Sequence, residues 1–200
     1  MINIHAFSGR MGNEMFRHAY LYAQAMEGII PDVYVQDYKY FEKYADEIKQ
    51  LFGQGIGYLG QVGVHIRRAG NPANLDEPKY FENPFYVNLC DTDYYEKAMA
   101  MFFDDDFLIF SDDPEWCKEK FKDNKKVQVM DKGDEVEDFN LLASCKSLII
   151  ANSSYSWWAA YLNPNPSKKV IAPLETKYYS DNVVRTKYPS DFIQIDFNKL

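Results

Sequence analysis

The arginines and histidines of this 200-residue chain are concentrated in two short segments. Only five of the 22 basic residues are arginines. Four of these five, and all three histidines, fall in or beside residues 9–18 and 65–71. Arginine is preferred over lysine where a planar fork must hold a phosphate or a carboxylate. In a chain with a net charge of -8, this clustering predicts one anion-binding site.

A pair of arginines, Arg67 and Arg68, follows directly on the apolar run 62–66. Open α/β sheets bind ligands at the carboxyl ends of their strands. The position therefore favours a diphosphate clamp, whose charge-assisted bonds stabilise a leaving group as its negative charge grows. Two exposed arginines after an edge strand are the structural alternative. His65, in the same run, can hydrogen-bond a base or a phosphate, or can be a packed core histidine.

Two aspartates follow the next apolar run, 107–110. Asp113 stands directly before Pro114, which is the expected arrangement of a helix N-cap and a first helical residue. That interpretation leaves Asp112 unexplained. A carboxylate at the end of a strand can accept two hydrogen bonds from a guanine edge or a ribose, so Asp112 is a candidate nucleotide ligand.

A third polar group follows the apolar run 148–151, where Asn152, Ser153 and Ser154 precede a pair of tryptophans. Small hydroxyl residues at the start of a helix form an anion site together with backbone N–H groups and the helix dipole. Ser153 and Ser154 are therefore candidate phosphate ligands. The alternative is that Ser154 is only an N-cap.

These side chains require an alternation of strands and helices to position them. Apolar runs predict strands at 2–7, 33–35, 62–67, 107–111, 127–130, 147–151 and 169–172. Helical spacing predicts helices from Asn13, with Phe16, Ala19, Tyr20 and Ala23 on one face, and at 38–52, 92–102, 114–122, 138–145 and 155–162. This order predicts an α/β fold with a parallel sheet that is covered on both faces. The glycine-rich stretch 53–57 suggests a boundary between residues 1–60 and 61–200.

Composition and charge exclude several other classes of protein. The net charge of -8 argues against a nucleic-acid or anionic-membrane partner, which would favour clustered lysine and arginine. No run is long and apolar enough to span a membrane, and the first residues do not resemble a signal peptide. Three cysteines without metal-binding spacing predict reduced thiols, a cytoplasmic location and no zinc site. We expect no metal ion to be required.

Together these segments resemble the alpha-1,2-fucosyltransferases of glycosyltransferase family 11. Residues 9–19 read GRMGNEMFRHA and are similar to the family's GGLGNQMFQYA, and His65 to Arg68 match the start of its HxRRGD. Residues 93–98 match its DYYxxA helix, and residues 110–116 match its FSDDxxW. Residues 138–158, DFNLLASCKSLIIANSSYSWW, are similar to its DxxLMSxCKHxIIANSSFSWW. Five motifs therefore occur in the family's order.

The resemblance implies a two-lobed GT-B fold, with a reduced acceptor-side lobe at 1–60 and a Rossmann-type nucleotide lobe at 61–200. It also implies metal-independent, inverting transfer of fucose from GDP-fucose to a glycan hydroxyl, by an alpha-1,2 linkage to galactose. By the same resemblance, Arg67 and Arg68 contact the diphosphate, and Ser153 and Ser154 contact a phosphate or the fucose. His65 and Asp138 lie near guanine, and Asp112 contacts the nucleotide. Asn13 contacts the donor sugar.

Two departures from the family pattern bear on catalysis. The acidic residue that follows the paired arginines in the family is absent, because the chain continues Ala69-Gly70-Asn71. A direct displacement needs a base for the acceptor hydroxyl, and Asp76 and Glu77 on the same loop are the substitutes we expect. Residues 37–61 are also shorter than their counterparts in the family. The alternatives are a non-catalytic GDP-sugar-binding module, a degenerate transferase, or a transferase that uses another GDP-sugar.

Overall fold

The computed structural model describes residues 11–27, 36–53, 55–68, 86–131, 133–177, 179–180, 182, 184 and 186–200. The predicted strands at 2–7 and 33–35 lie outside the described residues. The two candidate bases, Asp76 and Glu77, lie outside them as well.

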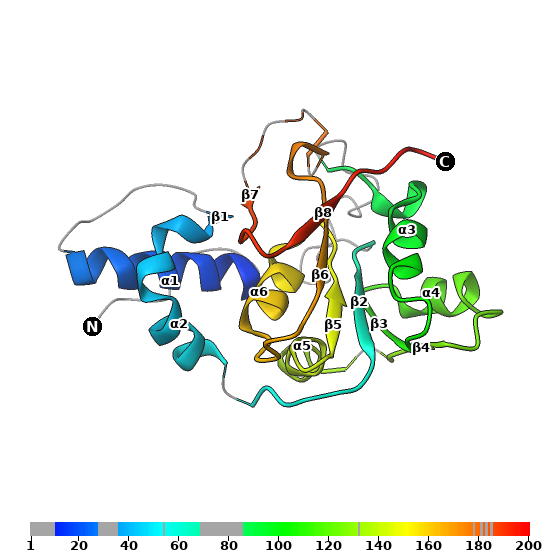
Figure 1. The fold of residues 1–200 in the computed structure, drawn as a ribbon, viewed down its shortest axis with the longest axis horizontal. Helices are drawn as coiled ribbons and strands as arrows, with labels where there is room; N and C mark the ends of the chain where they lie inside the picture. Colours follow the sequence, from blue (N-terminus) through cyan, green and yellow to red (C-terminus); the bar gives the residue numbers. More distant parts are fainter. Residues whose placement is uncertain are drawn as a thin grey trace.

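A six-stranded sheet is the centre of the C-terminal part of the chain (Figure 1). Its strands are β2 (Val62–Ile66), β3 (Phe107–Ser111), β4 (Val127–Val129), β5 (Ser147–Ile149), β6 (Val170–Pro173) and β8 (Ile193–Ile195). They lie in the order β4-β3-β2-β5-β6-β8, and every neighbouring pair is parallel. Counted along the chain, this is the 3-2-1-4-5-6 order of doubly wound nucleotide-binding sheets. The predicted α/β fold with a Rossmann-type sheet is confirmed.

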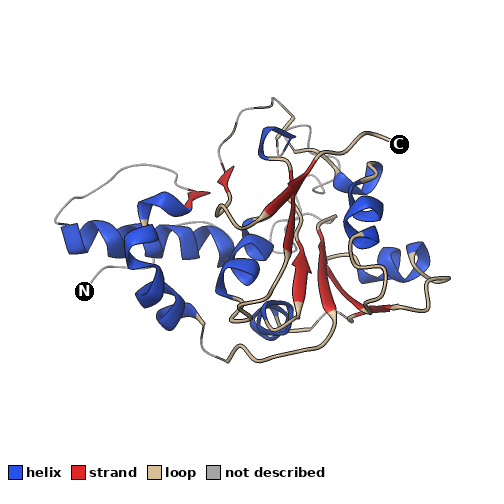
Figure 2. Ribbon diagram, in the orientation of Figure 1, coloured by secondary structure: helices blue, strands red, loops and turns tan. Residues whose placement is uncertain are grey.

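Helices cover both faces of the sheet (Figure 2). They are α3 (Tyr94–Ala100) and α4 (Pro114–Lys120) on one face, and α5 (Glu135–Ala143) and α6 (Ser154–Leu162) on the other. Strand residues alternate between two hydrophobic clusters, one with α3 and α4 and the other with α5 and α6. Coverage of both faces explains why β2 is buried throughout, including Gly63 and His65.

The N-terminal part of the chain packs against α6. It contains α1 (Met11–Glu27), β1 (Gln36–Asp37), two 3-10 turns (Tyr38–Tyr40 and Glu42–Tyr44) and α2 (Ala45–Phe52). β1 pairs in parallel with β7 (Thr186–Lys187) to form a separate two-stranded sheet. The division of the chain at residue 60 stays a prediction.

Aromatic rings join the N-terminal part of the chain to α6. The rings of Phe16 and Trp157 are 4.5 Å apart, and Phe41 stacks on Trp158 at 5.4 Å. The predicted apolar face of α1 is confirmed, since Phe16, Ala19, Tyr20 and Ala23 are buried. α1 and α6 therefore share one hydrophobic cluster.

Several predicted helix boundaries were wrong. α1 begins at Met11, so Asn13 lies within the first turn of the helix rather than at its N-cap. Residues 38–44 form 3-10 turns, and only Ala45–Phe52 is an α-helix. α5 begins at Glu135 because Asp134 caps it, accepting the N–H groups of residues 136 and 137. Asp138 is therefore one turn into the helix, and its interpretation as an N-cap was also wrong.

The strand β8 was not predicted. It begins twenty residues after the end of β6, and it pairs with β6 at the edge of the sheet. Of the helices in the described part of the chain, none is long and apolar enough to cross a bilayer.

Candidate functional site

The strand order reverses between β2 and β5, which is the switch point of the sheet. From β2 the chain proceeds to β3 and β4 on one side, and the later strands continue on the other side of β2. Ligands of such sheets bind at this reversal, beyond the carboxyl ends of the strands. In the observed register Val62 is opposite Phe107 and Ser147, so Arg67 leaves β2 level with Asp112 and Asn152. Three of the predicted polar groups therefore meet at one edge of the sheet.

Each arginine at the end of β2 is held by an aspartate at the end of β3. Arg67 Nη1 forms an ion pair with Asp112 Oδ2. The other oxygen of Asp112 accepts the backbone N–H of Arg68 at 2.8 Å, and Arg68 Nε donates to Asp113 Oδ2 at 3.2 Å. The arginine side chains are only 12% and 14% exposed, whereas Asp113 is 32% exposed, so the Arg67–Asp112 pair is better shielded from water than the Arg68–Asp113 pair. Asp112 thus binds the end of β2, a role that its position alone did not indicate.

The guanidinium of Arg68 is also held flat against an aromatic ring. Its Cζ lies 4.0 Å from the centroid of Trp116, which is a cation–π contact. Asp113 caps α4 by accepting the Trp116 N–H at 3.3 Å, as its sequence predicts. One carboxylate therefore fixes both the arginine and the helix that carries its aromatic platform. A guanidinium has five N–H donors, so an ion pair with a carboxylate is compatible with binding a second oxyanion.

The N-terminus of α6 lies at the carboxyl end of β5. Ser153, not Ser154, is the N-cap, and its hydroxyl makes no capping hydrogen bond to the helix. The first N–H groups of a helix have no acceptor within it, so they can bind an anion beside the Ser153 hydroxyl. The interpretation of Ser154 as a simple N-cap was wrong. Its hydroxyl instead donates to Asn13 Oδ1 at 2.7 Å.

Gly12 allows the first turn of α1 to approach α6. A Cβ at this position would lie 2.5 Å from the carbonyl carbon of Ser154 and 2.6 Å from the nitrogen of Tyr155. Only a glycine fits so close to another backbone. Asn13 is therefore brought to the same helix N-terminus as the two serines, although it belongs to the N-terminal part of the chain.

His65 and Asp138 both lie next to Tyr155. The His65 side chain is buried, and its ring centroid is 5.3 Å from that of Tyr155. The Tyr155 hydroxyl donates to the Glu135 carbonyl at 3.0 Å, which joins α6 to the start of α5. Burial raises the pKa of Tyr155, and the nearby charge of Asp138 raises it further. Sequence reasoning missed Tyr155, whose only signal was its place between two serines of the motif.

The carboxyl group of Asp138 is partly desolvated. Burial raises its pKa, although the Gly133 N–H, which donates to it at 3.2 Å, acts in the opposite direction. A carboxylate in this setting gains from a ligand that supplies further N–H donors.

Buried polar side chains hold the strand ends in place. Tyr95 donates its hydroxyl to the His65 carbonyl at 3.1 Å, and Tyr94 donates to the carbonyls of Ile150 and Ile171. Asn152 is buried, and its amide donates to the Val87 carbonyl at 2.9 Å. These contacts make the strand ends a rigid support for the site.

The cysteine thiols of the chain are largely buried. Burial raises the pKa of Cys90 and of Cys117 to about 11, and that of Cys145 to about 12, so these thiols stay protonated at neutral pH. In the described ranges, no three or more His, Cys, Asp or Glu side chains are grouped so as to hold a metal ion.

Known proteins resemble the chain in sequence. The O-antigen biosynthesis glycosyltransferase WbnK of Escherichia coli is 32% identical over 60% of this chain and 40% of its own length. An alpha-1,2-colitosyltransferase of Escherichia coli is 30% identical over 69% of this chain and 52% of its own length. The galactoside alpha-(1,2)-fucosyltransferase 2 of Rattus norvegicus is 30% identical over 58% of this chain and 35% of its own length. The chain thus spans about half the length of these relatives or less.

One solved structure, the heptosyltransferase WaaC of E. coli with ADP, matches 86% of this chain and 47% of its own, with a TM-score of 0.47 and 12% sequence identity. The sequence model of Glycosyl transferase family 11 matches residues 32–193, which include the ends of β2, β3 and β5 described above. The chain belongs to glycosyltransferase family 11.

Proposed function

We propose that this protein transfers fucose from GDP-fucose to a glycan hydroxyl, with inversion at the anomeric carbon and without a metal ion. The observation that carries the proposal is the convergence of the paired arginines with the N-terminus of α6 at the switch point of the sheet. Departure of GDP leaves negative charge on its diphosphate. Two fixed guanidinium groups and a helix N-terminus are suited to stabilise that charge in the transition state without a metal.

The group around Tyr155 supports guanine as the base. The edge of guanine presents two adjacent N–H donors, and a carboxylate such as that of Asp138 can accept both. Adenine has no such pair of donors on its edge. The buried His65 packs against this group, 5.3 Å from the Tyr155 ring. In this assignment Asn13, held by Ser154, contacts the donor sugar.

The acceptor hydroxyl must lose its proton during a direct displacement. Asp76 and Glu77 remain the proposed bases, with galactose in an alpha-1,2 linkage as the proposed acceptor. A second donor is favoured by the relatives, because the alpha-1,2-colitosyltransferase matches 69% of this chain. The distinction between GDP-fucose and GDP-colitose therefore belongs in the first experiment. A cytoplasmic location is part of the same proposal.

The test measures release of GDP from GDP-fucose, GDP-colitose and GDP-mannose, each with and without a panel of galactosides and with EDTA present. We expect release from GDP-fucose that depends on a galactoside and is unaffected by EDTA. Tight binding of GDP without turnover on any acceptor would instead identify a GDP-sugar-binding module. Turnover that EDTA abolishes would overturn the metal-independent mechanism.

Variants of Arg68 test the role of the arginines. Arg68→Ala should lower turnover by about 100-fold or more, and Arg68→Lys should restore little of it, because lysine lacks the planar fork. The matched control is Lys118→Ala, which removes a cation from exposed ion pairs on the neighbouring helix α4 and should leave turnover unchanged. Near-normal activity in Arg68→Ala would remove the diphosphate clamp from the mechanism.

A further inference from the structure

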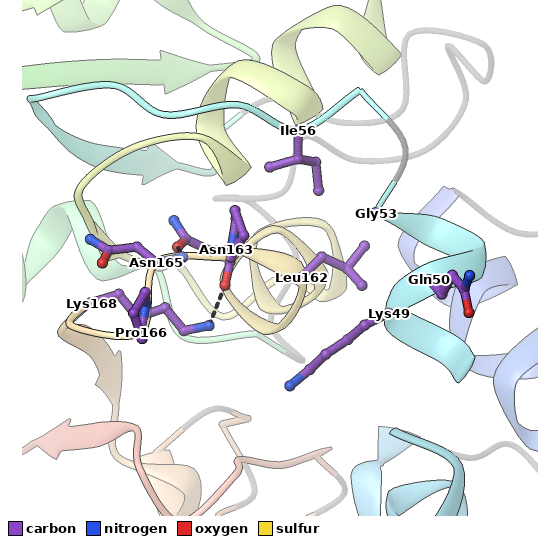
Figure 3. A pocket seen from close by; sticks show the side chains of 10 residues that line it. Lys49, Gln50, Gly53, Ile56, Leu162, Asn163, Asn165, Pro166 and Lys168 are labelled. Atoms are coloured by element: carbon purple, nitrogen blue, oxygen red, sulfur yellow. Dashed lines mark hydrogen bonds between the residues drawn. The ribbon is translucent and has the colours of Figure 1, made fainter. Parts of the chain in front are cut away.

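A cavity lies at the C-terminal end of α6. It has a volume of about 430 Å³ and is bounded by α2, by the connection to β2 at Ile56, and by the loop of residues 163–168 (Figure 3). Its polar side chains are Lys49, Gln50, Asn163, Asn165 and Lys168. Cavities of this size accommodate small-molecule ligands.

This cavity is separate from the site at the switch point. The proposed diphosphate contacts lie at Ser153 and Ser154, at the start of α6, whereas Leu162, its last residue, lines the cavity. With a rise of 1.5 Å per residue, the two ends of the helix are about 12 Å apart. None of the residues that line the cavity has a role in the proposed transfer reaction.

Among the described residues that line the cavity, two lysines carry charge. Figure 3 shows Lys49, from α2, and Lys168, from the loop, pointing into the same space. Neither ammonium group forms a salt bridge with a carboxylate among the described residues. Lys168 Nζ donates to the Asn163 carbonyl at 2.6 Å, and Lys49 Nζ lies 5.0 Å from the centre of the Tyr161 ring. The cavity is therefore positively charged in a chain whose net charge is -8.

The positive charge in the cavity is unfavourable as it stands. Burial, reinforced by the charge of Lys49, lowers the pKa of Lys168 to about 8, while the carboxylate of Asp191 acts in the opposite direction. Burial and the charge of Lys49 both disfavour the ammonium form of Lys168. An anion between the two lysines would relieve the repulsion and replace the lost hydration.

The wall of the cavity is held in shape before any ligand enters. The Asn163 amide donates to the Cys145 carbonyl at 2.6 Å, and the Asn165 amide donates to the Lys146 carbonyl at 2.8 Å. The side-chain oxygens of these asparagines accept the N–H groups of Asn165 and Ser167. The loop that carries Lys168 is thus anchored to the end of α5 and the start of β5, so a ligand would not have to order it.

We propose that this cavity binds a sugar-sized ligand that carries one anionic oxygen group, placed between Lys49 and Lys168. The volume exceeds what a bare phosphate needs, and the remaining lining, which includes Gln50, is polar enough for hydroxyl groups. A phosphorylated sugar and a sugar acid share this chemistry. The ligand would bridge α2 and the loop 163–168, and so join the N-terminal part of the chain to the sheet.

The experiment titrates the full chain by calorimetry with glucose 6-phosphate, glucuronate and glucose. We expect one or both of the anionic sugars to bind and glucose not to bind. A preference for either anionic sugar would identify the group that the lysines select. Equal binding of glucose and the anionic sugars, or no binding of any of the three, would overturn the proposal.

Charge-removing variants assign the binding to this cavity. Lys49→Gln and Lys168→Gln should each weaken binding by about tenfold or more, as the loss of a charged hydrogen bond does. Lys169→Gln is the matched control, because Lys169 is exposed on the same segment and does not line the cavity. Lys49 is itself exposed, so its variant should fold even if the Lys168 variant does not. An equal loss of binding in Lys169→Gln would refute the assignment, and unchanged GDP affinity in all three variants would confirm that the two sites are separate.

Discussion

The close contact between α1 and α6 predicts that adding a single methyl group at Gly12 will destabilise the protein. In Gly12→Ala, the new Cβ would lie 2.5 Å from the Ser154 carbonyl carbon and 2.6 Å from the Tyr155 nitrogen. Favourable contacts between carbon atoms lie at about 3.5–4.0 Å, so one helix must move by roughly 1 Å. Both neighbouring atoms belong to the backbone, so no side-chain rotation can relieve the clash.

Three contributions decide the size of the effect. Alanine is a better helix former than glycine by up to about 1 kcal/mol, which favours the variant. Overpacking costs about 1–3 kcal/mol, and loss of the hydrogen bond from Ser154 to Asn13 costs about 1 kcal/mol more. The variant should therefore lose about 1–3 kcal/mol of unfolding free energy, which lowers Tm by about 2–4 °C for each kcal/mol.

Urea unfolding and GDP titration measure the two consequences of this change. Because the displaced atoms belong to the first turn of α6, we expect GDP to bind more weakly as well. The matched control is Gly60→Ala, where a Cβ would meet nothing within 4 Å, and it should match the parent in both assays. If Gly12→Ala is as stable as the parent and binds GDP equally well, α1 and α6 do not meet as described.

Two further predictions concern charged side chains. Asp112→Asn removes the anion that holds Arg67. We expect calorimetry to show weaker GDP binding, because the Arg67 guanidinium loses its orientation. Tighter GDP binding would show that Asp112 acts only as a repulsive charge. For Lys168, the native pKa of about 8 lies below the ordinary value of 10.5, so the unfolded chain binds more protons between these values. Its contribution to stability should therefore rise from pH 8 to pH 10.5. In Lys168→Met, the free energy of unfolding measured with urea at several pH values should lack this rise. An identical pH dependence in the parent and the variant would contradict the burial of Lys168.

The sequence was most informative about the fold where a strand is buried on both faces. β2 and β3 are continuous apolar runs, and Asp113-Pro114 marks the start of α4 by local chemistry alone. β8 has only three residues, two of them exposed, so it lacks the apolar run that marks a buried strand. The start of α1 depends on its contact with α6, and a local pattern does not contain that contact.

The candidate site could be predicted in part because some of its residues directly follow buried strands. Paired arginines and serines at the ends of strands are visible in the sequence, and the register of the sheet brings them to one edge. The partners of these residues are not visible. Asn13 and Ser154 are 141 positions apart, and the place of Tyr155 beside His65 depends on how α6 packs. Likewise, neither Lys49 nor Lys168 belongs to a motif, and only the folded chain brings them together.

The three tryptophans give this protein two separate optical reporters. Trp157 and Trp158 are 1% and 0% exposed, between α1 and α6, so their emission follows the integrity of the core. Trp116 is only partly buried and lies under the guanidinium of Arg68, whose charge perturbs the indole directly. A ligand that draws Arg68 away from this ring will change the emission of Trp116 and leave the core pair unaltered. Difference spectra of the Trp116→Phe variant can therefore separate occupancy of the site from unfolding in a single titration.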